Sequence, residues 1–276
     1  MTLKADQTNI FDKIGLSNWQ LFVNRNFAKN FSTAPLLSEY IYDIRGPFTP
    51  VAASKFARVF RCKVNFASHE QDLFFKQYLY RSPIDFLKHI FRPSRAKRAA
   101  AAAIMLAQHG LSTPEIIAIG QLKIAGLAIK TFVITRTIEN AKDLYACIEE
   151  VLQAPVLQRH KFLTDLGTTI GTMHNAGIFH GDLRPGNVMV RIQDGNWKFY
   201  FLDNERTKKF AQIPEKLRLK NLIQINMIIS DQLTAADRMR FYKSYRKAHT
   251  TPIQNQKQLA INTAQKTAQR LEKKLQ

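Results

Sequence analysis

The chain has 276 residues, with 41 Lys and Arg against 21 Asp and Glu, and a formal net charge of +20 at pH 7. Its hydrophobic fraction of 45% is ordinary for a folded protein and excludes wholesale disorder. Two cysteines cannot build a disulfide framework, and no apolar run approaches the roughly 20 residues that span a bilayer. Residues 1–15 lack the apolar core of a secretory signal, so we do not expect secretion by that route. The excess positive charge predicts an anionic partner: nucleic acid, a phosphorylated substrate or an anionic membrane surface.

The first half of the chain predicts strands on either side of one helix. Aromatic and β-branched residues predict strands at residues 56–64, 72–78, 115–119 and 127–135. The polar stretch at residues 65–71 predicts the turn between the first two strands. Ser94 is the expected cap of a helix over residues 95–109, which contains five consecutive alanines and ends before Gly110. Residues 1–40 are mixed in character, and we expect them to form an N-terminal extension.

The second half of the chain is mostly helical. Apolar residues at helical spacing predict helices at residues 143–152, 156–175, 216–229, 234–249 and 262–275. The dipeptide Asp194-Gly195 lies between two short apolar segments and predicts a tight hairpin. Thr234 followed by Asp237 resembles a capping box at the start of a helix. We expect residues 251–276 to form a basic, polar helical tail that is loosely attached.

The residues that carry chemistry lie just before and after this hairpin. Residues 180–187 read HGDLRPGN, and the hairpin that follows ends in Asp203. Phosphoryl transfer needs a carboxylate near the acceptor hydroxyl and oxygen ligands for Mg²⁺. Asp182, Asn187 and Asp203 supply such groups. In the alternative, purely structural interpretation these are turn residues and a strand-end cap, and His180 is a buried hydrogen-bonding histidine.

This pattern resembles the catalytic loop of the protein-kinase-like fold, which is H-x-D-x-x-x-x-N followed by a strand pair and a metal-binding Asp. The resemblance implies that Asp182 acts on the acceptor hydroxyl and that Asn187 and Asp203 bind Mg²⁺. It also implies that His180 braces the loop. Arg184 is placed to stabilise charge on the transferring group. The implied cofactors are ATP and Mg²⁺.

The corresponding lysine for the ATP phosphates should lie on the strand before the helix, and Lys76 is the candidate. No G-x-G-x-x-G precedes it, so the turn at residues 50–56 offers Ser54 and Lys55 as phosphate contacts instead. Ala99 stands where a Glu of the helix would pair with Lys76. Either another acid serves, or the nucleotide alone holds the lysine. These departures leave a pseudokinase scaffold as an alternative, although the complete set of loop residues argues against it.

The residues after Asp203 distinguish between kinds of kinase. The sequence continues Asn204-Glu205-Arg206, without the Phe-Gly and the later Ala-Pro-Glu of protein kinases. An acid two residues after the metal-binding Asp resembles small-molecule kinases of the choline and aminoglycoside type. Glu205 is therefore a candidate for a further metal ligand or for support of the other ligands. An aminoglycoside substrate is not expected, because aminoglycosides are polycationic and bind in acidic clefts, whereas this chain is strongly basic.

A set of short segments, in order along the chain, resembles the lipopolysaccharide kinase (Kdo/WaaP) family over about residues 58–245. The segments read FRPSRAKR, HGLSTP, HGDLRPGN, LDNER and KNLIQIN. The resemblance implies an α+β, protein-kinase-like bilobal fold. Its small antiparallel-sheet N-lobe would span residues 41–137, and its mostly helical C-lobe residues 138–250. Family members are kinases of Gram-negative bacteria that phosphorylate heptose or Kdo of the lipopolysaccharide inner core at the cytoplasmic face of the inner membrane.

The positive charge fits this interpretation. Three segments are strongly basic: residues 86–98, 206–220 and 238–247. Any one of them is explained equally well as a solvated face. Together they favour lipopolysaccharide core or another anionic glycoconjugate as the partner, with peripheral binding to an anionic membrane surface on the cytoplasmic side. Another small-molecule or protein kinase of the same fold remains an alternative. A nucleic-acid partner is not expected, because no recognition motif is present.

Overall fold

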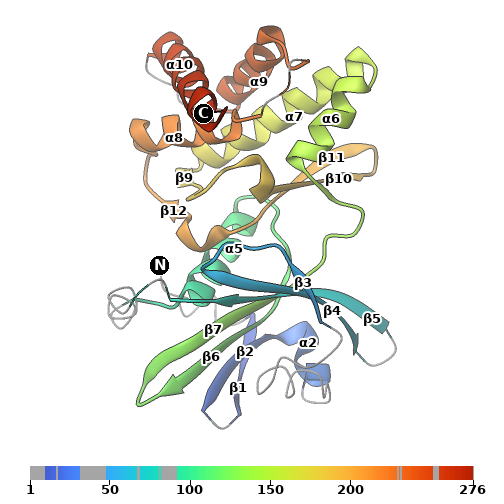
Figure 1. Ribbon diagram of the computed structural model, residues 1–276, viewed down its shortest axis with the longest axis vertical. Coiled ribbons are helices and arrows are strands. Elements are labelled where there is room, and N and C mark those ends of the chain that lie inside the picture. Colours follow the sequence, from blue (N-terminus) through green and yellow to red (C-terminus); the bar gives the residue numbers. More distant parts are fainter. Residues whose placement is uncertain are drawn as a thin grey trace. The chain divides into compact units, whose positions relative to one another are not determined.

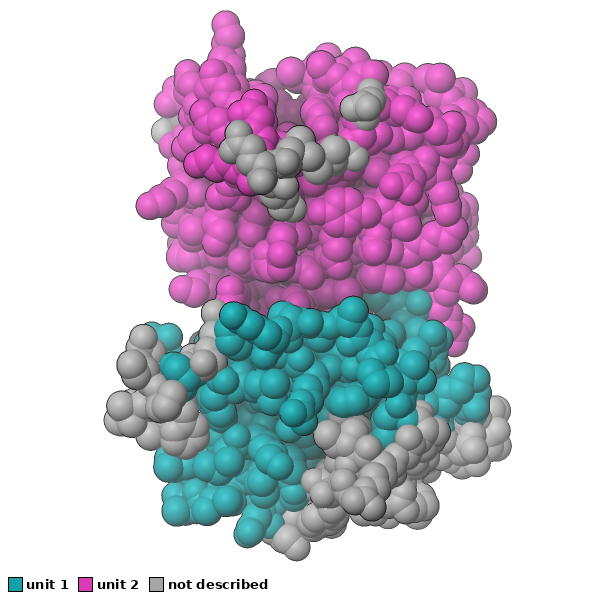
Figure 2. All heavy atoms as spheres, in the orientation of Figure 1, with its two compact units in different colours: residues 1–104, 114–138 teal, residues 105–113, 139–276 magenta. Residues whose placement is uncertain are grey.

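The computed structural model describes residues 10–16, 18–31, 48–66, 69–80, 82, 92–228, 230, 232–250 and 255–275. The chain divides into two compact units, which are coloured separately in Figure 2. The first comprises residues 1–104 and 114–138, and the second residues 105–113 and 139–276. Among the described residues, none of the helices is both long and apolar enough to cross a membrane.

The first unit is built on a seven-stranded antiparallel sheet with the order β1-β2-β6-β7-β5-β4-β3 (Figure 1). Its strands are β1 (Phe11–Leu16), β2 (Trp19–Asn24), β3 (Phe48–Val51), β4 (Ala57–Phe66), β5 (His69–Tyr78), β6 (Ile116–Ile124) and β7 (Leu127–Arg136). The four strands expected from the sequence are confirmed as β4, β5, β6 and β7. The turn expected over residues 65–71 is shorter than predicted, because β4 and β5 extend into it from both sides.

The hairpin β1–β2 was not predicted from the sequence. It adds to the sheet through β2, whose Leu21 pairs with Gly120 of β6. Leu21 and Val23 are fully buried, whereas β1 carries Asp12, Lys13 and Gly15, which are uncommon in strands. This segment of the expected N-terminal extension is therefore an integral part of the sheet.

Two helices lie on opposite faces of this sheet. Helix α5 (Arg95–Gln108) confirms the predicted alanine-rich helix, and its small side chains Ala96 and Ala100 pack with Ile119 and Val133 of the sheet. Helix α2 (Arg25–Phe31) places Phe27 against the aromatic cluster on the other face. The alanines allow the α5 backbone to lie close to the sheet.

The second unit is mostly helical. Its helices are α6 (Leu144–Gln153), α7 (Val156–Asn175), α8 (Glu215–Ile225), α9 (Ala235–Lys247) and α10 (Gln256–Leu275). Its short strands are β8 (Lys142–Asp143), β9 (Ile178–Phe179), β10 (Val188–Gln193), β11 (Asn196–Phe201) and β12 (Lys208–Lys209). The hairpin predicted at Asp194-Gly195 is confirmed between β10 and β11, with positive φ angles of 51° and 72° at its two turn residues.

Helix α7 lies directly along α9 because two of its glycines allow close approach (Figure 1). A Cβ atom on Gly167 would lie 2.3 Å from the Phe241 carbonyl oxygen, and one on Gly171 would lie 2.4 Å from the Tyr245 carbonyl oxygen. No larger residue fits at either place without moving the helices apart. The buried face of α7 thus meets α9 backbone to backbone.

The C-terminal helix corrects the expectation of a loosely attached tail. Helix α10 packs on α8, and Leu259, Thr263 and Thr267 are buried along one side of it. The two threonine hydroxyls donate to the carbonyls four residues earlier, at 2.7 Å each, which satisfies them inside the helix. The polar composition misled the prediction because both threonine hydroxyls are satisfied inside the helix, and Asn226 also donates to Thr267 Oγ1 at 3.3 Å.

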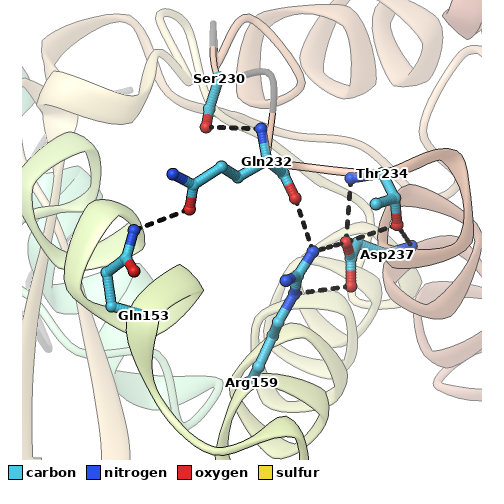
Figure 3. Close-up of polar contacts among 6 residues, drawn as sticks. All are labelled: Gln153, Arg159, Ser230, Gln232, Thr234 and Asp237. Atoms are coloured by element: carbon cyan, nitrogen blue, oxygen red, sulfur yellow. Dashed lines mark hydrogen bonds and ion pairs between the residues drawn. The ribbon is translucent and has the colours of Figure 1, made fainter.

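An ion pair joins the start of α7 to the start of α9 (Figure 3). Arg159 donates from Nε to Asp237 Oδ1 at 3.0 Å, from a terminal nitrogen to Asp237 Oδ2, and to the Gln232 carbonyl at 2.7 Å. Asp237 also accepts from the Thr234 backbone at 2.9 Å, which confirms the predicted capping box. The carboxylate is therefore shared between a helix cap and a tertiary contact.

Replacing Asp237 by Asn should destabilise the fold by about 3–5 kcal/mol, because it leaves Arg159 half-buried without its counter-ion. Urea unfolding measures this. The matched control is Glu150→Gln, which breaks the exposed pair with Lys142 and should cost less than about 1 kcal/mol. Equal stabilities for the two variants would contradict the assignment of Asp237 as an anchor.

The stabilisation that the Arg159–Asp237 pair contributes to the fold should fall at acid pH. Burial raises the pKa of Asp237, but hydrogen bonds from Arg159 and Thr234 outweigh it, so the pKa is lowered overall. The stabilisation is then complete above the usual carboxyl pKa of about 3.9 and is lost as the pH falls through the lower folded value.

Candidate active site

The predicted catalytic loop lies in the second unit, between β9 and β10, and is closed by its own hydrogen bonds. Asn187 Nδ2 donates to the Asp182 carbonyl at 2.8 Å, and the Asn187 backbone donates to the Arg184 carbonyl at 2.8 Å. A Cβ atom on Gly181 would lie 2.1 Å from Cβ of Arg206, so only glycine fits there. The loop therefore lies directly against the segment that follows Asp203.

The Asp182 side chain is held from two directions. Arg184 donates to both carboxylate oxygens, at 2.8 and 2.6 Å, and Gln224 of α8 donates to Oδ1 at 3.2 Å. The Asp182 side chain is 27% exposed, whereas Arg184 is 61% exposed. An acceptor hydroxyl that reaches Asp182 therefore meets an oriented carboxylate with a cation beside it. The sequence predicted Asp182 and Arg184 but not Gln224.

His180 joins the loop to the segment around Asp203. Its ring is fully buried, and Nε2 lies 2.9 Å from the Leu202 carbonyl and 3.1 Å from Asn204 Oδ1. The Asp182 backbone N–H donates to Nδ1 at 3.1 Å. These partners fit a neutral ring with its proton on Nε2, and burial lowers the pKa of His180 accordingly. The ring thus connects Asp182 with the residues on both sides of Asp203.

The candidate metal ligands lie at one end of the β10–β11 hairpin. Val188 pairs with Phe201, and the Leu202 backbone donates to the Asn187 carbonyl at 2.9 Å, so Asn187 and Asp203 lie at the same edge. Asp203 is exposed and adopts the left-handed conformation with φ of 55°, a strained geometry typical of functional sites. Because the Asn187 amide nitrogen donates to the Asp182 carbonyl, Oδ1 is the side-chain atom of Asn187 that can bind a metal ion.

The donor atoms of Asp203 and Asn187 suit Mg²⁺ better than a metal ion that is coordinated by protein side chains alone. Glu205, the third candidate, is buried at 8% exposure. Among the described residues no three His, Cys, Asp or Glu side chains converge as a metal site. Mg²⁺ is usually bound by one or two carboxylates, with waters and substrate phosphates filling its shell. Asp203 with Asn187 meets that requirement.

The candidate nucleotide contacts belong to the first unit. Lys76 of β5 pairs with Val133 of β7, so its side chain is on the face that α5 covers, and Nζ lies 5.5 Å from the centre of the Tyr78 ring. Ser54 and Lys55 lie in the turn between β3 and β4, and both are exposed. The structure brings Asp182, Arg184, His180, Asn187, Asp203 and Glu205 into one unit and Lys76, Ser54 and Lys55 into the other.

No acid occurs on α5. Ala99 occupies the position where the kinase pattern has a Glu that pairs with the lysine, and it is buried at 8% exposure.

A buried polar network behind the loop was missed by sequence reasoning. Asn221 of α8 is fully buried; it accepts the His180 backbone N–H at 3.1 Å and donates to the His180 carbonyl at 2.7 Å. His174 lies 3.2 Å from Asn221 and 2.9 Å from the Tyr245 hydroxyl. The available signal was the pair of uncharged polar residues Asn221 and Gln224, three positions apart among the apolar residues at the end of α8. Their hydrogen bonds fix the backbone of the loop.

The histidines of this network predict acid sensitivity. Burial lowers the pKa of His174 to about 3, and it also lowers the pKa of His180 and of His249. The unfolded chain takes up protons near pH 6.5, so stability should fall as the pH drops below about 6.5, by about 1.4 kcal/mol per pH unit for His174. Urea midpoints between about pH 7 and pH 5 measure this. Equal midpoints would contradict it, and His174→Gln should flatten the dependence.

The basic segments are only partly a surface feature. Arg218 is buried at 7% exposure and donates to the Tyr245 hydroxyl at 3.0 Å. Arg238 donates to the carbonyls of Asn226 and Ile228, at 3.0 Å each. Part of the first segment, residues 86–91, lies outside the described residues. The exposed cations of the other two segments are Arg206, Lys208, Lys209, Lys216, Lys220, Lys243, Arg246 and Lys247.

Comparison with known proteins identifies a family for this chain. A family model described as the lipopolysaccharide kinase (Kdo/WaaP) family matches residues 59–245. A 3-deoxy-D-manno-octulosonic acid kinase of Vibrio parahaemolyticus is 29% identical over 107 residues, which cover 38% of this chain and 41% of that protein. One of Photobacterium profundum is 26% identical over 133 residues, covering 48% and 52%. The matches span only 30–52% of the length of the curated relatives.

A solved structure of WaaP in complex with acyl carrier protein superposes with a TM-score of 0.63 at 17% identity, covering 90% of this chain and 98% of that one. At this identity the likeness shows a shared fold. The sheet-based first unit and the helical second unit confirm the expected α+β, protein-kinase-like class. The chain belongs to the lipopolysaccharide kinase (Kdo/WaaP) family.

Proposed function

We propose that this protein transfers the γ-phosphate of ATP to a sugar hydroxyl, of heptose or Kdo, in the lipopolysaccharide inner core. The observation that carries the proposal is the position of Asp182. Its carboxylate is oriented by Arg184 and Gln224, and His180 connects it to the Asp203 segment. This geometry occurs in a chain that belongs to a lipopolysaccharide kinase family.

Each residue of the site has a defined part in this reaction. The acceptor hydroxyl hydrogen-bonds to Asp182, which takes up its proton as the new P–O bond forms and the bond from the γ-phosphorus to ADP breaks. Asn187 and Asp203 would hold Mg²⁺, which neutralises charge on the phosphates when bound. Arg184 is exposed beside Asp182 and stabilises the negative charge of the transferring group.

The nucleotide side of the proposal rests on the first unit. Lys76 is assigned to the ATP phosphates, with Ser54 and Lys55 in the turn that replaces a glycine-rich loop. Glu205 is assigned to the support of Asp203, two residues away and buried. The absence of an acid from α5 favours one other candidate function, a pseudokinase scaffold that does not transfer phosphate.

The proposed setting is the cytoplasmic face of the inner membrane, with peripheral attachment. The exposed cations of residues 206–220 and 238–247 support it, because each Lys or Arg near an anionic membrane contributes about 1 kcal/mol. The same charge suits an acceptor that already carries phosphate or carboxylate groups. Lipopolysaccharide core or another anionic glycoconjugate is therefore the proposed partner.

Phosphate mapping on lipopolysaccharide from cells with and without the gene tests this function. We expect one inner-core phosphate to disappear without the gene. The wild-type gene should restore it, and a gene encoding Asp182→Ala should not. Unchanged core phosphorylation would refute the substrate assignment, and restoration by the Asp182 variant would favour the scaffold.

A further inference from the structure

A cationic pocket of about 160 Å³ lies in the first unit, between the N-terminus of α5 and the β6–β7 hairpin. The polar side chains of its lining are those of Tyr80, Arg92, Ser94, Lys97, Gln121 and Lys123. A water molecule takes about 30 Å³ in the liquid, so the pocket has room for a small oxyanion. The loop and metal-ligand residues described above contribute nothing to this lining.

The charged side chains are all positive among the described residues that line the pocket. Among the described residues that line it, Arg92, Lys97 and Lys123 are the charged ones, and no described carboxylate forms an ion pair with any of the three. Lys97 is half-buried, with Nζ 4.7 Å from the centre of the Phe22 ring. Lys13 also lies on this side of the sheet, because it pairs with Phe22. Cations gathered in this way repel one another unless an anion joins them.

The neighbouring positive charges also affect the pKa of Lys97. Burial lowers the pKa of Lys97, and the charges of Lys123 and Lys13 lower it further. A bound anion would raise the pKa of Lys97 again, because it favours the protonated form of the lysine.

Neutral donors complete the lining. Ser94 Oγ accepts the Lys97 backbone N–H at 3.3 Å and the Gln121 side-chain amide at 2.5 Å. Because both lone pairs are then engaged, the Ser94 hydroxyl proton remains available to a ligand. The pocket also lies at the first turn of α5, where the helix dipole favours negative charge. Cations, a hydroxyl donor and a helix terminus therefore converge on one hollow.

We propose that this pocket binds a phosphate group, separately from the nucleotide assigned to Lys76. Lys76 pairs with Val133, whereas the pocket reaches Ala128 on the same strand, five residues away. The far end of the pocket is therefore about 17 Å from Val133 along β7, whereas the lining residue Gln121 pairs with Thr131, about 7 Å from Val133 along the strand. The phosphate comes from one of two sources, a free phosphorylated metabolite or the headgroup of a phospholipid.

Binding of inorganic phosphate to the full chain tests the proposal, with a non-hydrolysable ATP analogue and Mg²⁺ at saturation so that the nucleotide site is filled. We expect calorimetry to show phosphate binding in the wild type. Lys97→Gln and Lys123→Gln should each weaken it about 10- to 100-fold, since each removes a charged hydrogen bond. The matched control is Lys130→Gln: Lys130 pairs with Leu122, on the opposite face from Gln121, and is exposed.

Vesicles distinguish the two sources of phosphate. Phosphatidic acid in phosphatidylcholine vesicles should retain the wild type but not Lys97→Gln if a lipid headgroup is the ligand. If the vesicles retain the wild type and Lys97→Gln equally, while binding of inorganic phosphate depends on Lys97, the ligand is a free phosphorylated metabolite. The proposal is overturned if Lys97→Gln and Lys123→Gln bind phosphate as the wild type does. It is also overturned if the wild type binds no phosphate at millimolar concentration.

Because the cations repel one another when no anion is bound, Lys97→Gln should fold at least as stably as the wild type in the absence of phosphate. Thermal unfolding in a phosphate-free buffer checks this, and keeps a loss of phosphate binding distinct from a loss of folding.

Discussion

Replacing Asp182 by Ala should lower the rate of phosphate transfer by about 100- to 10,000-fold, because the acceptor hydroxyl loses the group that takes its proton. The fold should survive, because Asp182 is partly exposed and its partner Arg184 is 61% exposed, so no buried charge is left unpaired. Mg·ATP binding should remain near that of the wild type, since Asp182 is not assigned to the nucleotide. Steady-state transfer rates and nucleotide titrations measure the two effects separately.

The matched control is Asp165→Ala on α7. Asp165 forms an exposed pair with Lys161 one helical turn away and has no part in the site. Its removal changes the same charge in the same unit and should leave the rate unchanged. Wild-type turnover by Asp182→Ala would refute the role of the loop, whereas equal losses in both variants would point to a general effect of charge.

Replacing Asp203 by Asn should lower the transfer rate by about 1,000-fold or more, because the metal loses its charged protein ligand. Asn tolerates the left-handed backbone conformation that Asp203 adopts, so the segment should keep its shape. Mg·ATP should also stabilise this variant against unfolding less than it stabilises the wild type. For the wild type, about 2.7 kcal/mol of stabilisation is expected at a hundredfold excess over the dissociation constant.

Asp194→Asn provides the control for the same hairpin. Asp194 lies at the turn, at the opposite end from Asp203, and its positive φ suits Asn equally well. This variant should keep both the rate and the stabilisation by Mg·ATP. Full stabilisation of Asp203→Asn by Mg·ATP would contradict the metal assignment, and no stabilisation of the wild type would favour the scaffold.

The sequence predicted those parts of the fold that local patterns specify. The alanine run and its serine cap predicted α5, and Asp194-Gly195 predicted the hairpin that places Asn187 near Asp203. The loop itself was recognisable because its residue types recur at fixed spacing. Each of these features depends on residues close together in the chain, where propensity and spacing are informative.

The remaining features depend on tertiary contacts that no local pattern encodes. Strand β1 was missed because its polar residues lie at the sheet edge, where pairing with β2 compensates for weak propensity. Arg218 and Arg238 counted as surface charge in the sequence, yet both bind oxygen atoms inside the second unit. The role of Asn221 is likewise invisible without its partner, because its hydrogen bonds reach His180, far away in the sequence.

Phosphate transfer by the purified full chain is the decisive assay for kinase activity on the inner core. The assay combines γ-phosphate-labelled ATP, Mg²⁺ and isolated inner-core glycolipid bearing Kdo and heptose, with wild type and Asp182→Ala compared side by side. We predict label on a core sugar with the wild type and background label with the variant. Label that never reaches the core glycolipid while ATP is bound, or equal labelling by both proteins, would contradict the account.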